Sequence, residues 1–259
     1  MDVRAMDRWF QWLLYLLIAA GAVFGLAPFL APATFASIAG FQGTDVFMYR
    51  LAGAATFGYA VGLTLGLRAG WSEVRIPIIA TYVFNAASIV ACIVAIAANA
   101  QPVVYVILAA SILFTASTGY FLRRPPRPHE PAPEGTLATW VTALFVIGVL
   151  AAFAFGLAPL ILGGAFGHAL GYPGNDDFVY RQGGAATLGA AVGGVYVLQA
   201  RTWAAARLPA IMAITFNGLS FIAAVLDIAS GGTPIAWVIL AASGLVTVGM
   251  SVAVMRGGR

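Results

Sequence analysis

One stretch of this sequence occurs twice, and the duplication constrains what the chain can fold into. Residues 45–62 are DVFMYRLAGAATFGYAVG and residues 176–193 are DDFVYRQGGAATLGAAVG, with 12 of the 18 positions identical. Between the copies lies a segment rich in Pro and Arg, which favours an extended, solvated backbone over a helix. The sequence therefore predicts two repeats, residues 1–122 and 136–259, joined by a linker at 123–135.

Composition places both repeats in a membrane. Hydrophobic residues make up 61% of the chain and charged residues only 8%, whereas a typical soluble domain has about 25% charged residues. A helix that crosses a bilayer needs about 20 mostly apolar residues. Eight segments meet this requirement: 9–29, 46–67, 76–98, 102–122, 137–162, 178–198, 208–229 and 234–255.

The predicted fold class is thus an all-α membrane protein, with eight transmembrane helices arranged as a tandem parallel repeat of two four-helix bundles. Each repeat has an even number of spans, so both enter the membrane in the same direction. Parallel repeats of this kind are related by a pseudo-two-fold axis along the membrane normal.

All basic residues are Arg, and their positions predict the orientation. Eleven of the thirteen lie at the chain ends or in loops on one side of an eight-span topology: Arg4, Arg8, Arg68, Arg75, Arg123, Arg124, Arg127, Arg201, Arg207, Arg256 and Arg259. Because positive loops stay in the cytoplasm, we expect an inner (plasma) membrane protein with both termini cytoplasmic. The two exceptions, Arg50 and Arg181, occupy the same position in the repeated stretch.

The repeated stretch predicts a helix with two unlike faces. On a helix of 3.6 residues per turn, the positions that differ between the copies fall mainly on one arc, at 48, 51, 52 and 59. We expect this arc to face lipid and the retained arc to face protein. Glycines such as Gly58 and Gly189 predict close helix packing, because small residues let helix backbones approach each other in a membrane.

Two Tyr-Arg pairs on the retained arc form the candidate ligand site: Tyr49, Arg50, Tyr180 and Arg181. A charge at membrane depth is costly unless it is paired or reaches the interface. One interpretation is therefore structural, with Asp45, Asp176 and Asp227 as salt-bridge partners and with Lys able to replace either Arg. The other is a pocket near the pseudo-axis that holds an anionic or polar ligand, since a guanidinium suits carboxylate or phosphate.

Two amides near the middle of predicted spans, Asn85 and Asn217, join this candidate set. A buried amide must find hydrogen-bond partners in hydrocarbon. Those partners are expected across the axis, on the helix backbone, or on a substrate at the membrane midplane.

Several chemistries lack the residues they need. The chain has no Lys for a Schiff base and a single Cys, Cys92, and it contains none of the common hydrolase, metalloprotease or P-loop motifs. We therefore expect no catalytic residues, no metal site, no cofactor and no nucleic-acid partner. A quinone pocket needs no motif, so that kind of site stays open.

Two functions remain. A four-span unit of this size resembles the small DoxX-like membrane domains in topology, and no residue role follows from that resemblance. The preferred hypothesis is a non-enzymatic accessory or structural membrane module that packs against a membrane protein or a second copy of the chain. The alternative is a carrier or ligand-binding protein that holds a small polar or anionic ligand between the repeats. A polar cavity of roughly a few hundred Å³ that reaches Asn85 and Asn217 would favour the alternative, and a packed, dry interface would favour the module.

Overall fold

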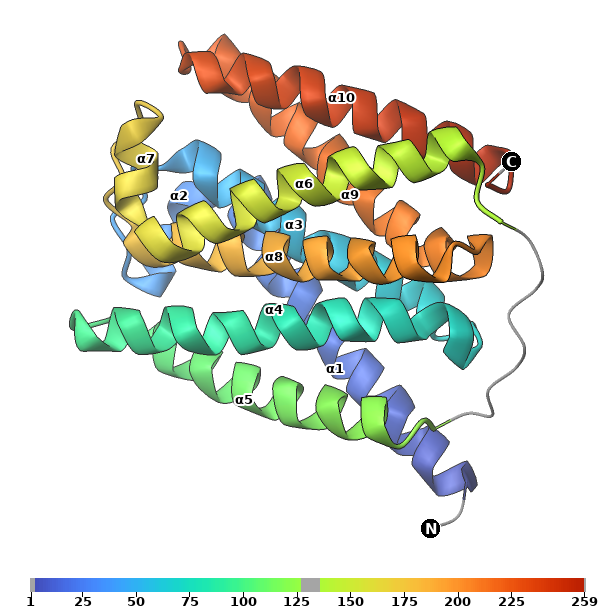
Figure 1. Cartoon of the computed structure of the whole chain (residues 1–259). Helices are drawn as coiled ribbons and strands as arrows, with labels where there is room; N and C mark the ends of the chain where they lie inside the picture. Colours follow the sequence, from blue (N-terminus) through green and yellow to red (C-terminus); the bar gives the residue numbers. More distant parts are fainter. Residues whose placement is uncertain (1–2, 127–135, 259) are drawn as a thin grey trace.

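The computed structural model describes residues 3–126 and 136–258, and these form ten helices (Figure 1). Eight of them are long and apolar enough to cross a membrane, as expected, whereas α2 and α7 are short. Linker residues 127–135, with Arg127, lie outside the described residues, as does Arg259. The helices are α1 (Val3–Leu30), α2 (Pro32–Ala39), α3 (Val46–Gly66), α4 (Trp71–Ala97), α5 (Pro102–Arg123), α6 (Thr139–Leu162), α7 (Gly164–Ala169), α8 (Asp177–Ala200), α9 (Trp203–Ala229) and α10 (Pro234–Met255).

The bundle has two distinct ends. The described chain ends and both ends of the linker lie at one of them, here called the linker face (residues 3, 124, 136 and 255). The short helices α2 and α7 lie at the other, here called the loop face (Figure 1). They occupy the connection between α1 and α3 and the connection between α6 and α8, outside the eight predicted spans.

Within each half, glycines bring the first two spans together. A Cβ on Gly53 of α3 would lie 2.5 Å from the carbonyl oxygen of Gly25 in α1. The matching glycine of α8, Gly184, would place a Cβ 2.6 Å from the carbonyl oxygen of Gly156 in α6. Only glycine permits such close contact, so the repeat builds the same helix pair twice.

The remaining contacts of the central helices come from the other half. α4 packs far more extensively on α8 than on α3, and α9 packs far more on α3 than on α8 (Figure 1). A Cβ on Gly189 of α8 would lie 2.5 Å from the carbonyl oxygen of Ala80 in α4, and one on Gly58 of α3 would lie 3.1 Å from that of Met212 in α9. The predicted close packing at Gly58 and Gly189 is therefore present, but it joins the halves.

This exchange corrects the expectation of two self-contained bundles. Near the linker face, Phe10, Trp71 and Phe121 of the first half still share one core. Near the loop face, the hairpin α9–α10 packs on α1 and α3, and α4–α5 packs on α8. The halves therefore exchange hairpins at the loop face and also touch near the linker face, where Leu208 of α9 joins the first-half core and Arg207 lies 3.5 Å from Glu73.

The predicted lipid-facing arc is also wrong. Tyr59 is 4% exposed, and Met48 and Ala52 are the atoms that a Cβ on Gly183 of α8 would meet. The reason is that α3 and α8 are central helices that pack on several neighbours, and their exposed apolar side chains, such as Leu65 and Tyr196, lie near the linker face instead. The variable positions of the repeat face the interior of the protein instead.

Candidate functional site

At the loop face, each repeat binds the other through an aspartate that precedes its central helix. Asp45 is 1% exposed. Its Oδ1 accepts hydrogen bonds from the amide of Gly174 (2.8 Å) and the hydroxyl of Tyr180 (2.7 Å). Its Oδ2 accepts from the amides of Asn175 (2.9 Å) and Asp176 (3.2 Å). Four donors of the second half thus satisfy one carboxylate of the first.

The second aspartate makes the reciprocal contact. Asp176 is 4% exposed, and its two oxygens accept from the amides of Gln42 and Gly43, both at 2.8 Å. Between the two aspartates, the side-chain amide of Asn175 donates to the hydroxyl of Thr44 at 3.1 Å. Thr44 and Asn175 hold the same position in the two copies (175 − 44 = 131). We call Asp45, Asp176 and these donors the aspartate clasp.

The clasp corrects the predicted ion pairs, because neither of its carboxylates contacts an Arg. The partner of Arg181 is Asp177, whose carboxylate lies 2.6 Å from Nε. Nη1 of the same Arg donates to the backbone carbonyls of Leu160 and Ile161, both at 2.8 Å, at the end of α6. Arg181 therefore ties α8 to the last turn of α6.

Its counterpart Arg50 differs. The position equivalent to Asp177 is Val46 in the first copy, and within the described part of the chain the side chain of Arg50 forms no hydrogen bond or ion pair. The third predicted partner, Asp227, accepts a hydrogen bond from the hydroxyl of Tyr172 at 2.8 Å. Burial raises the pKa of Tyr172, which keeps this hydroxyl protonated as a donor.

Two cavities lie deeper in the bundle, and each contains one of the predicted amides. The large pocket, about 310 Å³, is lined mainly by α3, α6, α8, α9 and α10 and includes Asn217. The small pocket, about 130 Å³, is lined by α1, α3, α4, α5 and α8 and includes Asn85. The two Asn side chains do not meet across an axis. Each donates to the carbonyl oxygen four residues earlier, that of Thr81 or Ala213, at 2.8 Å.

The two pockets are lined by equivalent positions of the two copies, and the largest differences in side-chain size between them fall at four positions. Large side chains line the small pocket where smaller residues line the large one. The pairs, small pocket first, are Leu17 and Gly148, Tyr59 and Ala190, Leu63 and Gly194, and Phe114 and Val246. At each of these four positions the second copy has the smaller side chain.

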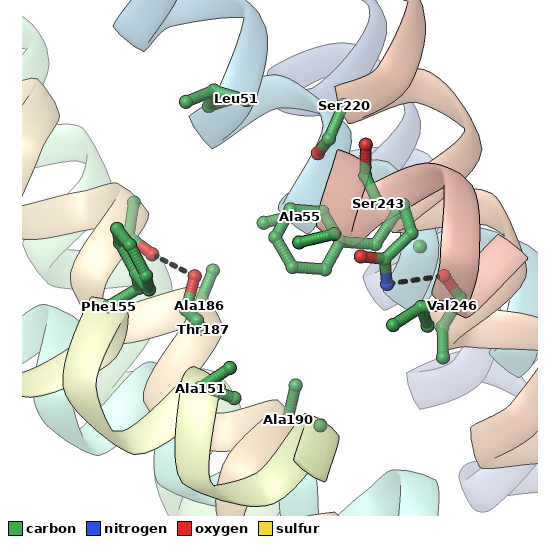
Figure 2. Close-up of a pocket in the computed structure, with 18 of the residues that line it drawn as sticks. Leu51, Ala55, Ala151, Phe155, Ala186, Thr187, Ala190, Ser220, Ser243 and Val246 are labelled. Carbon is green, nitrogen blue, oxygen red and sulfur yellow. Dashed lines mark hydrogen bonds between the residues drawn. The ribbon is translucent and has the colours of Figure 1, made fainter. Parts of the chain in front are cut away.

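Polar groups distinguish the pockets as well. In the small pocket, the hydroxyls of Ser88 and Ser111 lie 2.9 Å apart, and the amide of Gln182 donates to Ser88 at 2.8 Å. The equivalents in the large pocket are Ser220, Ser243 and, in place of the Gln, Leu51. Figure 2 shows both serines on one wall, across the open space from Phe155 and Thr187.

The large pocket is exposed between α6 and α10. Its lining includes Ile147 and Phe155 on α6 and Leu245 on α10, whose side chains are all exposed. These two helices touch each other much less than α9 and α10 do. None of the described residues that line the pocket is charged. An apolar molecule could therefore reach it from the lipid.

The predicted site residues are thus divided between places. Tyr49 and Tyr180 reach the pockets, whereas both Arg lie outside the pocket linings. Sequence reasoning missed the pockets, although the variable positions Leu51 and Tyr59 were their signal. Among the described residues, no group of three or more His, Cys, Asp or Glu is placed to hold a metal ion. Comparison with family models, curated proteins and solved structures finds no match to this chain.

Proposed function

We propose that this multi-pass membrane protein is a non-enzymatic, ligand-binding protein whose large pocket holds an uncharged, mainly apolar molecule. One observation carries the proposal: a cavity of about 310 Å³, lined almost wholly by apolar side chains, in the middle of the bundle. Pockets for small molecules have volumes of about 300–1,000 Å³ and are mostly apolar with a few placed polar groups. The ligand-binding alternative of the sequence is therefore preferred over the accessory module.

The ligand that we propose also differs in kind from the one that the sequence led us to expect. A polar or anionic ligand was expected between the two Arg residues. Arg181 is occupied by Asp177 and two carbonyl groups, and the lining of the large pocket carries no charge to attract an anion. The ligand instead enters from the bilayer between α6 and α10, where it already has an apolar environment.

We further infer that the two halves form a tandem parallel repeat with a pseudo-two-fold axis near the Thr44–Asn175 contact. Support comes from residues at equivalent positions that touch each other there. The linker face is proposed to be cytoplasmic in an inner (plasma) membrane, because the Arg-rich loops lie on that side.

Photo-crosslinking tests the proposal. An alkane that carries a diazirine should label the large-pocket walls of the purified protein in lipid nanodiscs, as located by mass spectrometry of the peptides. Ala190→Tyr should abolish this labelling, because Ala190 lines the large pocket and the equivalent position of the first copy already accommodates a Tyr, Tyr59. The hydroxyl of Tyr59 donates to the carbonyl of Ala186, and the carbonyl of Ala55 offers the introduced ring the same partner.

The matched control is Val238→Tyr, which adds a Tyr to the exposed surface of α10 outside the pocket. It should leave the labelling unchanged. Equal labelling of the pocket peptides in both variants would contradict the proposal. If native purification instead gives a stoichiometric membrane protein or a stable homo-oligomer and no pocket labelling, the accessory module is the better explanation.

A further inference from the structure

We infer that the ligand carries an uncharged oxygen, a hydroxyl or a carbonyl within an apolar chain, and that the hydroxyl of Ser220 binds this oxygen near the membrane midplane. The hydroxyl of the neighbouring Ser243 already donates to the carbonyl of Leu240 at 3.3 Å, so it can only accept a hydrogen bond from a ligand hydroxyl. The inference rests on the proposed function and specifies the chemistry of the same pocket. Its starting point is that the hydroxyl of Ser220 is buried, at 3% exposure, and has no hydrogen-bond partner among the described residues.

An unsatisfied hydroxyl in an apolar interior is costly, because it has lost its water without gaining a protein partner. Other hydroxyls on these helices avoid that cost by donating to the carbonyl four residues earlier. Thr187 donates to Gly183 at 2.8 Å, and Thr247 donates to Ser243 at 2.7 Å. Ser220 makes no such bond, so its hydroxyl stays available to a molecule in the pocket.

The small pocket shows what is missing. There the serine equivalent to Ser220, Ser88, has two partners: the hydroxyl of Ser111 at 2.9 Å and the amide of Gln182 at 2.8 Å. In the large pocket the Gln is replaced by Leu51, which cannot form a hydrogen bond. In the small pocket, protein side chains from both halves, Ser111 and Gln182, therefore satisfy the serine, whereas in the large pocket the place of the Gln amide is left for a ligand.

The position of the serines restricts the ligand. Ser220 and Ser243 lie near the middle of α9 and α10, far from both faces of the bundle. Asn217, three residues before Ser220, lies on the same side of α9 and also lines the pocket. A phospholipid headgroup stays at the interface, so the ligand's oxygen belongs to a chain that enters the hydrocarbon. With no charged residue in the lining, that oxygen is neutral.

Native mass spectrometry of the detergent-solubilised protein can test this with three probes of equal carbon number: a symmetrical long-chain ketone, the corresponding secondary alcohol and the alkane. The wild-type protein should bind the ketone, the alcohol or both more tightly than the alkane, by roughly three- to tenfold, the contribution of one neutral hydrogen bond. Ser220→Ala should remove this preference and leave alkane binding unchanged. Ser88→Ala, the equivalent change in the small pocket, should keep the preference.

A second variant guards against an uninformative loss of folding. Leu51→Gln restores the amide found in the small pocket, so it should raise the melting temperature of the ligand-free protein and weaken binding of the oxygenated probes. Equal binding of all three probes by the wild-type protein would overturn the inference and leave the proposed function intact. Failure of every probe to bind, or binding that Ala190→Tyr does not block, would instead contradict the proposed function.

Discussion

The aspartate clasp allows a quantitative prediction of stability, because its two aspartates are equivalent in sequence and accept different numbers of hydrogen bonds. Asp45 accepts four hydrogen bonds, whereas Asp176 accepts two from the facing loop. Asn at either position keeps one acceptor oxygen and turns the other into a donor. In both variants at least one buried backbone N–H loses its acceptor, and the surviving hydrogen bonds lose the charge.

The magnitude follows from the number of bonds. A hydrogen bond to a charged group contributes about 1.5–3 kcal/mol, and a neutral one about 1 kcal/mol. Asp45→Asn loses one bond and weakens three by about 1 kcal/mol each, which gives about 4–6 kcal/mol. Asp176→Asn loses one and weakens one, which gives about 2–4 kcal/mol. Relief of the buried charge offsets part of both losses, so a difference of about 2 kcal/mol should remain.

Thermal unfolding in one detergent, followed by the fluorescence of the Trp residues, measures that difference. For a protein of this size, about 2 kcal/mol corresponds to a midpoint roughly 4–8 °C lower for Asp45→Asn than for Asp176→Asn. Thr44→Ala removes only an exposed contact of the clasp and should change the midpoint little. Equal midpoints for the two Asn variants, or a lower one for Asp176→Asn, would refute the reasoning.

Three further predictions concern packing, charge and topology. Gly189→Leu should lower the melting temperature strongly, because a Cβ there would lie 2.5 Å from a backbone oxygen. Gly148→Leu should leave the melting temperature unchanged, because a Cβ at Gly148 meets open space. Similar melting temperatures of the two variants would refute this prediction. Arg181→Lys should destabilise the protein, because an ammonium cannot reproduce the bonds of the guanidinium fork to Asp177 and two carbonyls. Arg50→Lys should be tolerated. The thermal midpoints of the two variants decide this, and equal tolerance would restore the expectation from sequence. Alkaline phosphatase fused between α2 and α3 or between α7 and α8 should be active, and fused after α5 or α10 inactive; the reverse pattern would invert the membrane orientation.

The sequence predicted the eight spans because crossing a bilayer requires only a local property of each segment, namely its length and apolar composition. It did not predict which half each hairpin contacts. Two similar halves carry similar packing surfaces. The surface of α9 can therefore pack on α3 of the first half or on the equivalent helix of its own half, α8. Whether such a surface is satisfied within a half or between halves depends on three-dimensional geometry, as in domain swapping.

The candidate site was predicted less well, because the positions that differ between the two copies were misinterpreted. Differences between the copies were interpreted as exposure to lipid, since exposed positions vary most easily. Tyr59 and Ala190 show the other cause: equivalent positions of the two copies line two pockets of different size. The exchange of Val46 for Asp177 was equally visible, and it explains why Arg181 is paired and Arg50 is not. Each signal was in the sequence, and its meaning depended on knowing that α3 and α8 lie at the centre.

The exchange of hairpins also has a consequence for biosynthesis. When α4 and α5 leave the ribosome, the helix that will cover them, α8, has not been made. The first half must therefore wait in the bilayer with its contact face open until the second half inserts and the two lock together at the loop face. A chain truncated after the linker should stay unassembled and be degraded by proteases. Two separately encoded halves, expressed together, should recover the protein.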